Sequence, residues 1–215
     1  MIYLNNYGWN DKLSQLKQES TYNALTHGRI SIVHRTCYEV VSENGLFQCE
    51  LTGNMMYGKS DIELPCTGDW VLFQPFDEHK GIIVDMLPRE RTLYRKKNGT
   101  VADKQAIASY VDKAFIVQSL DDNFNVRRAE RFMVQMQEEN INPVLVFNKA
   151  DLGFDEQKVE EQIRHIARQI PVFFTSIHQP QTILQLRESI SAGETVVFVG
   201  SSGVGKRVDC NDGDH

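Results

Sequence analysis

The first half of the chain alternates hydrophobic and polar residues in short runs. In one run Phe47, Cys49 and Leu51 fall on one face, while Gln48 and Glu50 fall on the other. Turn residues separate five such runs, at residues 29–33, 37–41, 46–51, 69–73 and 81–87. Short strands at this spacing within residues 28–88 predict a small closed barrel, which leaves no exposed sheet edge. An OB-fold is the expected form, and an SH3-like barrel is the alternative. Residues 1–27 predict an N-terminal extension with a short helix.

The second half alternates apolar runs with amphipathic helices. Strands are expected at residues 114–119, 143–147, 171–175 and 195–199. Asn125 and Asp155 are candidate N-caps of two helices, and a third helix is expected near residues 181–191. Helical spacing turns one set of side chains inward: Ala129, Phe132, Met133, Met136, Val159, Ile163, Ile166, Ala167, Ile170, Ile183, Leu186 and Ile190. This pattern predicts an α/β domain with a mostly parallel sheet, which binds ligands at the carboxyl ends of its strands.

The run GSSGVGK directly follows the last predicted strand and fits the phosphate-loop pattern GxxxxGK. Its glycines let backbone N–H groups face a phosphate, and Lys206 adds a positive charge for the outer phosphates. The predicted phosphate site consists of Gly200, Ser201, Ser202, Gly203, Val204, Gly205 and Lys206. The pattern usually continues with Ser or Thr, whose hydroxyl binds Mg²⁺, but Arg207 stands here.

The tetrapeptide Asn148-Lys149-Ala150-Asp151 follows a predicted strand and has the side chains needed to read a guanine base. The Asp151 carboxylate can accept hydrogen bonds from guanine N1–H and the exocyclic amine, a pair of donors that adenine does not offer. Asn148 can meet the N7/O6 edge and brace the phosphate loop, and the stem of Lys149 can cover the base. Ser176, after the next strand, is placed to offer a backbone N–H to guanine O6.

The guanine motif precedes the phosphate loop, which reverses the order of an ordinary GTPase and predicts a circular permutation. From about Tyr7 to Lys206, the chain resembles the circularly permuted ribosome-associated GTPases of the RsgA (YjeQ/YloQ) type. The resemblance also rests on GDWVLF (68–73), QAIASYVD (105–112) and SLDDNFNVRRAERF (119–132). It implies an OB-fold that contacts ribosomal RNA, a GTPase domain and a zinc-binding domain. Such proteins hydrolyse GTP to GDP on the small ribosomal subunit late in its maturation. The resemblance assigns guanine recognition to Asn148, Lys149, Asp151 and Ser176, and phosphate binding to residues 200–206.

Parts of the family pattern have no counterpart in this sequence. Arg207 replaces the Mg²⁺ ligand, and the switch segments, the DxxG motif and the zinc cluster are missing. No catalytic residue is identified, so GTP hydrolysis by this chain is not expected. One alternative is a non-catalytic RNA- and guanine-nucleotide-binding remnant, and a remote one is an ATP-dependent P-loop enzyme. The GTPase domain is expected at residues 106–207 and to break off after the phosphate-loop strand, with residues 208–215 as an atypical tail.

The resemblance also predicts the order of the strands. In a Ras-like sheet the four strands would be neighbours, and the strand at residues 195–199 would lie at an open edge. An apolar edge strand can pair with another chain, so self-association is expected.

Composition sets the remaining expectations. The net charge of −6 argues weakly against bulk nucleic-acid binding, but residues 89–104 hold six basic and two acidic residues, a net +4. This basic linker, taken as residues 89–105, predicts RNA contacts at Arg95, Lys96 and Lys97, and a solvated linker is the alternative. The sequence has no long apolar segment, no signal peptide and four cysteines without a CxxC pair. It therefore predicts a cytoplasmic protein with reduced thiols, no membrane partner and no metal site.

Overall fold

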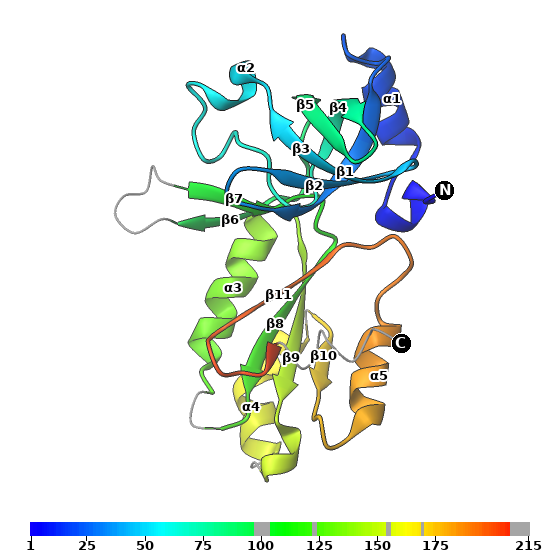
Figure 1. Cartoon of the computed structure of the whole chain (residues 1–215). Coiled ribbons are helices and arrows are strands. Elements are labelled where there is room, and N and C mark those ends of the chain that lie inside the picture. The colour runs from blue at the N-terminus through cyan, green and yellow to red at the C-terminus, as the bar shows by residue number, and fades with distance from the viewer. Residues whose placement is uncertain (97–103, 122–123, 154–155, 169, 207–215) are drawn as a thin grey trace. The chain divides into compact units, whose positions relative to one another are not determined.

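The computed structural model describes residues 1–96, 104–121, 124–153, 156–168 and 170–206 (Figure 1). The chain divides into two compact units, residues 1–111 with 193–195 and residues 112–192 with the segment from 196 onward. Each unit has its own sheet and its own hydrophobic core.

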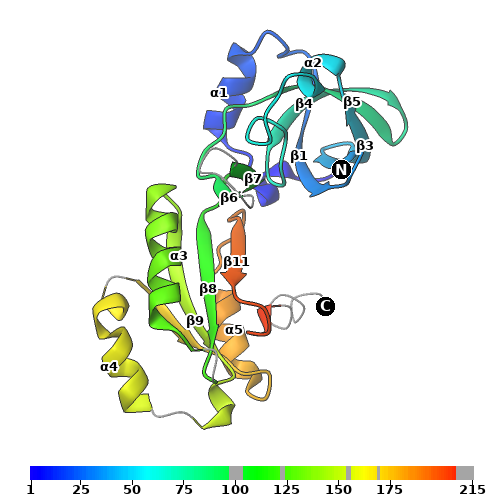
Figure 2. The ribbon, with the colours of Figure 1, turned by 90° about the vertical axis from the view of Figure 1, so that its left-hand side faces the viewer.

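The first unit is built on a closed five-stranded barrel with the order β1-β2-β3-β5-β4 (Figure 2). Its β3 and β5 strands pair in parallel, and the other neighbours are antiparallel. The strands are β1 (Thr26–Val33), β2 (Tyr38–Ser42), β3 (Gly45–Leu51), β4 (Trp70–Asp77) and β5 (Lys80–Met86). They overlap the five alternating runs of the sequence, and the OB-fold-like barrel is confirmed.

Alternation along β3 shows why these residues form the barrel. Phe47 and Cys49 are buried, whereas Gln48 and Glu50 are exposed, so one face of the strand supplies the core. The barrel core also contains Ile30, Val40, Val71, Phe73 and Ile83.

Burial raises the pKa of the Cys49 and Cys66 thiols to about 12, so both remain protonated at neutral pH. The three cysteines in the described residues, Cys37, Cys49 and Cys66, are free thiols.

The N-terminal segment packs onto the same unit. Helix α1 (Asp11–Glu19) begins after Asn10, whose side chain accepts a hydrogen bond from the Leu13 N–H at 3.1 Å. A short 3₁₀ turn η1 (Leu4–Tyr7) precedes it, and helix α2 (Gly53–Met56) follows β3. A second buried cluster joins η1 and α1 to the barrel strands. It consists of Leu4, Leu13, Val41, Trp70, Leu72, Leu87 and Tyr110.

Residues 93–96 and 104–108 pair as two strands, a hairpin that the hydrophobic pattern did not predict. Strands β6 (Leu93–Lys96) and β7 (Lys104–Ala108) pair in antiparallel fashion, where the sequence predicted a basic linker at residues 89–105.

An ion pair lies just before the hairpin. The Asp69 carboxylate is fully buried and accepts from the Arg89 guanidinium at 2.6 Å and from the Cys66 N–H at 2.7 Å.

The second unit is a four-stranded parallel sheet with the order β10-β9-β8-β11. Its strands are β8 (Lys113–Ser119), β9 (Asn142–Asn148), β10 (Val172–Phe174) and β11 (Val196–Gly200), and its helices are α3 (Val126–Glu138), α4 (Glu156–Ala167) and α5 (Pro180–Glu188). The Asn125 side chain caps α3 as predicted and accepts from the Arg128 N–H at 3.1 Å. The other predicted cap, Asp155, and the side chain of Ala167 lie outside the described residues.

The remaining inward side chains are buried or partly buried, as predicted, but Ile170 and Ile190 lie beyond the ends of α4 and α5. Phe132 and Ile190 are partly buried, and the others are buried: Ala129, Met133, Met136, Val159, Ile163, Ile166, Ile170, Ile183 and Leu186. Strand β11 lies at the sheet edge, with β8 as its one neighbour in the described part of the chain. None of the described helices combines the length and apolarity needed to cross a membrane.

Candidate guanine-nucleotide site

The carboxyl ends of the four parallel strands bring distant parts of the sequence together. Ser119 at the end of β8 pairs with Asn148 at the end of β9, and Gly200 at the end of β11 pairs with Val117. Strand β10 ends at Phe174, so Thr175 and Ser176 leave the sheet at the same edge. This edge is where a parallel α/β sheet binds ligands.

Asn148 connects the guanine motif to the phosphate loop. Its buried side chain donates from Nδ2 to the Val204 carbonyl at 3.0 Å, across 56 residues of sequence. Its Oδ1 accepts from the Lys149 N–H at 2.8 Å and from the Thr175 hydroxyl at 3.3 Å. One amide therefore fixes the ends of β9 and β10 and the phosphate loop in a single arrangement, which includes the contact to the loop expected from the sequence.

The phosphate loop requires glycine where it meets its neighbours. A Cβ on Gly200 would lie 2.4 Å from the Val117 carbonyl oxygen, and one on Gly205 would lie 2.1 Å from Asn148 Nδ2. Both residues also have positive φ, 153° and 95° respectively. Val204, between them, is fully buried in the core of this unit. The loop is thus anchored by one apolar side chain while Ser202 and Gly203 remain exposed.

Lys206 lies over the start of the loop. Its ammonium donates to the carbonyls of Gly200 at 2.9 Å and Ser201 at 2.5 Å. The charge that the sequence assigns to the outer phosphates is therefore held against the loop. Arg207 falls outside the described residues.

Lys149 is oriented by an acidic residue that the sequence analysis did not single out. Its ammonium lies 2.7 Å from Asp121 Oδ2, and the Ser119 hydroxyl donates to Asp121 Oδ1, also at 2.7 Å. Lys149 has a positive φ of 62°, which turns the chain sharply out of β9. Asp121 lies two residues after the end of β8, and this position at the carboxyl end of a parallel strand could have marked it as a candidate site residue.

Asp151 lies in the turn η2 (Ala150–Leu152), and both of its oxygens face the segment after β10. Oδ1 accepts from the Ser176 hydroxyl at 2.5 Å, and Oδ2 lies 4.0 Å from His178 Nε2. The Ser176 hydrogen bond is the main reason that the pKa of the Asp151 carboxyl lies below its ordinary value, and His178 acts in the same direction. Asp151 is therefore a carboxylate at neutral pH, as reading guanine donors requires.

The backbone of Ser176 is already hydrogen-bonded. Its N–H donates to the Thr182 hydroxyl at 3.0 Å, and its own hydroxyl accepts from the His178 N–H at 3.0 Å. A contact from the Ser176 N–H to guanine O6 would have to replace the bond to Thr182. The N–H of Ile177 has no acceptor within the described residues and can serve the same oxygen. Sequence reasoning missed Thr182 and His178 because neither follows a strand directly.

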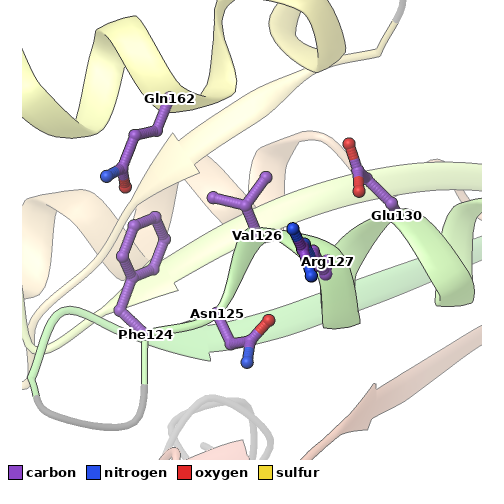
Figure 3. A pocket seen from close by; sticks show the side chains of 6 residues that line it. All are labelled: Phe124, Asn125, Val126, Arg127, Glu130 and Gln162. Carbon is purple, nitrogen blue, oxygen red and sulfur yellow. The ribbon is translucent and has the colours of Figure 1, made fainter.

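Two hollows flank helix α3. One, of about 530 Å³, is lined by Phe124, Asn125, Val126, Arg127 and Glu130 and by Gln162 from α4 (Figure 3). The residues of the guanine motif and the phosphate loop do not line it. The other, of about 300 Å³, is lined by Arg128, Arg131, Phe132 and Gln135 from α3 and by Gly200 and Ser201 from the phosphate loop. This second hollow adjoins the start of the phosphate loop.

The basic segment is divided by the fold. Arg89 is bound to Asp69, and Arg91 lies 3.5 Å from the Glu90 carboxylate. Both of these basic side chains of the predicted linker are therefore paired with acidic residues of the chain. Arg95 and Lys96 are exposed on β6, while Lys97 lies outside the described residues. The hairpin register sets Lys96 opposite Lys104, whose ammonium lies 5.8 Å from the centre of the Tyr94 ring.

The geometry of the second unit agrees with what comparison with known proteins finds. The family model described as RsgA GTPase matches residues 86–210, more than half of the chain. The chain belongs to the RsgA GTPase family. A relative from Bacteroides thetaiotaomicron, named small ribosomal subunit biogenesis GTPase RsgA 1, is 74% identical over 200 residues, which are 93% of this chain and 56% of the relative. A relative from Methanosarcina acetivorans, named small ribosomal subunit biogenesis GTPase RsgA, is 34% identical over 202 residues, which are 93% of this chain and 53% of that protein.

Two solved structures of this type have the same fold. YjeQ from Thermotoga maritima matches with a TM-score of 0.68 at 25% identity, over 88% of this chain and 66% of that chain. YloQ, described as a circularly permuted GTPase, matches with a TM-score of 0.61 at 24% identity, over 87% of this chain and 64% of that chain. The predicted family and the predicted fold, a barrel with a circularly permuted GTPase domain, are thus confirmed. The chain spans little more than half the length of the curated RsgA relatives described above.

Proposed function

We propose that this chain is the barrel and guanine-nucleotide-binding portion of a GTPase that acts in the cytoplasm, in small ribosomal subunit biogenesis. The reaction would be hydrolysis of GTP to GDP on the subunit late in its maturation. Guanine would be read by Asn148, Lys149, Asp151 and the segment at Ser176, and the phosphates would be held by residues 200–206. The observation that carries the proposal is the hydrogen bond from Asn148 Nδ2 to the Val204 carbonyl at 3.0 Å. It joins a base-reading motif to a phosphate loop, and a nucleotide needs both at one place.

Nucleotide titration tests the proposal. Fluorescent GDP, GTP and ATP would be titrated into the purified chain, with D151N as the matched variant. GDP and GTP should bind, and D151N should lose affinity for them about tenfold or more, because a neutral amide offers one acceptor where the carboxylate offers two. Binding of ATP in preference to GTP would favour an ATP-dependent P-loop enzyme and reject the guanine assignment.

Membership of the family implies that Mg²⁺ acts with the nucleotide, but the residues present do not fit that ion well. The hydroxyl side chain that normally follows the loop lysine is Arg207 here, and a guanidinium cannot bind a cation. Within the described residues no group of three or more His, Cys, Asp or Glu is placed to hold a metal. We therefore derive no step through Mg²⁺.

Arg207 favours a second candidate function, a non-catalytic module that binds guanine nucleotide and RNA. Single-turnover measurement of phosphate release, with and without small ribosomal subunits, separates the two. Release stimulated by the subunit supports the enzyme, and tight binding without release supports the module. R207S, which restores a hydroxyl next to Lys206, should increase Mg²⁺ dependence of GTP binding if the ligand position is the deficit.

Ribosomal RNA is the proposed partner of the β6–β7 hairpin. Arg95 and Lys96 are exposed there, and two like-charged lysines, Lys96 and Lys104, lie directly opposite each other. Such a pair is unfavourable by itself and is relieved by a phosphate. Charge reversal at Arg95, Lys96 and Lys97 should weaken subunit binding and reduce its dependence on salt concentration. Unchanged binding would remove the hairpin from the proposal and leave the barrel surface as the candidate contact.

A further inference from the structure

The hollow between helix α3 and the start of the phosphate loop is lined by positive charge. Arg128 and Arg131 contribute from α3, and Gly200 and Ser201 contribute from the loop. No carboxylate is among the side chains that line this hollow in the described chain. The carbonyls of Gly200 and Ser201 also hold the Lys206 ammonium, at 2.9 Å and 2.5 Å. The two loop residues that hold the Lys206 ammonium therefore line the same hollow as the two arginines.

Helix geometry places these two arginines on the same side of α3. Arg128, Arg131 and Gln135 are spaced at i, i+3 and i+7, so they lie along one stripe of α3. Arg127, one position earlier, lines the other hollow, on the α4 side of the helix (Figure 3). The stripe that faces the loop is thus distinct from the rest of the basic residues on this helix. Phe132, four residues after Arg128 on α3, also lines the hollow.

We propose that Arg128 and Arg131 form a subsite for the terminal phosphate of a nucleoside triphosphate held by the phosphate loop. This inference rests on the proposed function and adds to it a means of distinguishing GTP from GDP. A guanidinium donates several hydrogen bonds in a fixed plane and suits a phosphate oxygen pair. The hollow, of about 300 Å³, has room for a phosphate group beside the loop. A terminal phosphate is the one part of GTP that GDP lacks, so the two arginines contribute to GTP affinity and little to GDP affinity.

The affinities of fluorescent GDP and of a non-hydrolysable fluorescent GTP analogue test the subsite, measured on the unaltered chain, R128Q/R131Q and R127Q. Loss of charged hydrogen bonds to the phosphate should reduce GTP-analogue affinity about tenfold in R128Q/R131Q. GDP affinity should stay within about twofold, because the shared α- and β-phosphates are held by the loop. R127Q removes one positive charge from the same helix, where R128Q/R131Q removes two, on the side away from the loop, and should leave both affinities unchanged. R128K/R131K should recover part of the loss, since it keeps charge without the planar donor pair.

Circular dichroism and thermal melting of each variant separate loss of the subsite from loss of the fold. Equal losses for GDP and the GTP analogue, or the same loss in R127Q as in R128Q/R131Q, would overturn the subsite. Unchanged GTP-analogue affinity in R128Q/R131Q would also overturn it, while the proposed guanine site would stand. If the unaltered chain binds neither nucleotide, the proposed function fails and the subsite fails with it.

Discussion

The Asn148 side chain donates a hydrogen bond to the Val204 backbone carbonyl at 3.0 Å. This contact links the end of β9 to the phosphate loop after β11, although β8 lies between those strands in the sheet. Because Asn148 is buried and its oxygen also accepts from Lys149 and Thr175, the amide has little freedom to reorient. The guanine motif and the phosphate loop are therefore coupled through one side chain.

Replacement of Asn148 by alanine should weaken both halves of the site. The Val204 carbonyl and the Lys149 N–H would lose their partner, which costs about 1–3 kcal/mol of folding free energy per buried group left unpaired. GDP affinity should fall by at least tenfold because the loop and the base motif lose their fixed spacing. Calorimetry of nucleotide binding and thermal melting check both effects. T175V, which removes a longer bond of 3.3 Å to the same amide, is the milder control. Equal effects of the two variants would contradict a bridging role.

Two glycines of the phosphate loop form a matched pair for mutation. A methyl group on Gly205 would collide with Asn148 Nδ2 at 2.1 Å, whereas one on Gly203 would meet nothing within 4 Å. Both residues have positive φ, so both alanine variants carry a conformational cost of about 1–2 kcal/mol. G205A should in addition displace Asn148 and abolish measurable GDP binding, while G203A should retain it. Similar affinities for the two variants would show that the steric contact is unimportant.

Nucleotide affinity should depend on pH through Asp151. The Ser176 hydrogen bond lowers the pKa of its carboxyl, with a smaller effect of His178 in the same direction. A carboxyl with a lowered pKa stays ionised until the pH falls through that lowered value, so GDP binding should be constant from pH 6 to 8 and lost only in acid. S176A removes the main cause, and its loss of binding should begin at a higher pH than in the unaltered chain. H178Q should shift the acid limb less. GDP titrations at closely spaced pH values, with folding monitored in parallel, measure both shifts, and identical acid limbs would exclude this role for Ser176.

The buried ion pair between Asp69 and Arg89 should contribute strongly to the stability of the barrel unit. Asp69 is fully buried and accepts hydrogen bonds from Arg89 and from the Cys66 N–H. D69N leaves the Arg89 guanidinium, largely buried, without its counter-charge, and should destabilise the barrel by about 3 kcal/mol. Glu90 forms partly exposed ion pairs with Lys12 and, at 3.5 Å, with Arg91, and it offers a control because E90Q should change stability by less than about 1 kcal/mol. Urea unfolding followed by tryptophan fluorescence tests both, and a small effect of D69N would mean that solvent reaches the pair.

The edge position of β11 predicts self-association. In the described part of the chain β11 pairs on one side alone, and its apolar residues are only half-buried. The molecular mass measured by light scattering should therefore increase with protein concentration for the isolated chain. V197K places a charge on this edge and should restore a monomer, whereas a lysine at exposed Leu184 on α5 should not. A monomer at high concentration for the unaltered chain would reject the prediction.

The order of motifs, with three further family-like segments, predicted the family, and the spacing of apolar residues predicted the barrel and the parallel sheet. Alternation in β3 and helical spacing in α3 are local properties, so they could be read without knowing which elements pack together. The hairpin β6–β7 was missed because its short strands are dominated by basic and small residues, and only its two-strand pairing makes them strands. A Ras-like sheet predicted only that the four strands are neighbours with β11 at the edge, and the full order β10-β9-β8-β11 came from the structure.

The sequence by itself determined which side chains are available to read a guanine base and hold phosphates, because Asp, Asn, Lys and glycine carry that chemistry wherever they stand. Only the tertiary structure decided which groups are already engaged. The Ser176 N–H is bound to Thr182, the Lys149 ammonium is paired with Asp121, and Arg128 and Arg131 face the phosphate loop. These partners are separated along the chain and meet because parallel strands end at one edge of a sheet, a distance that residue spacing does not encode.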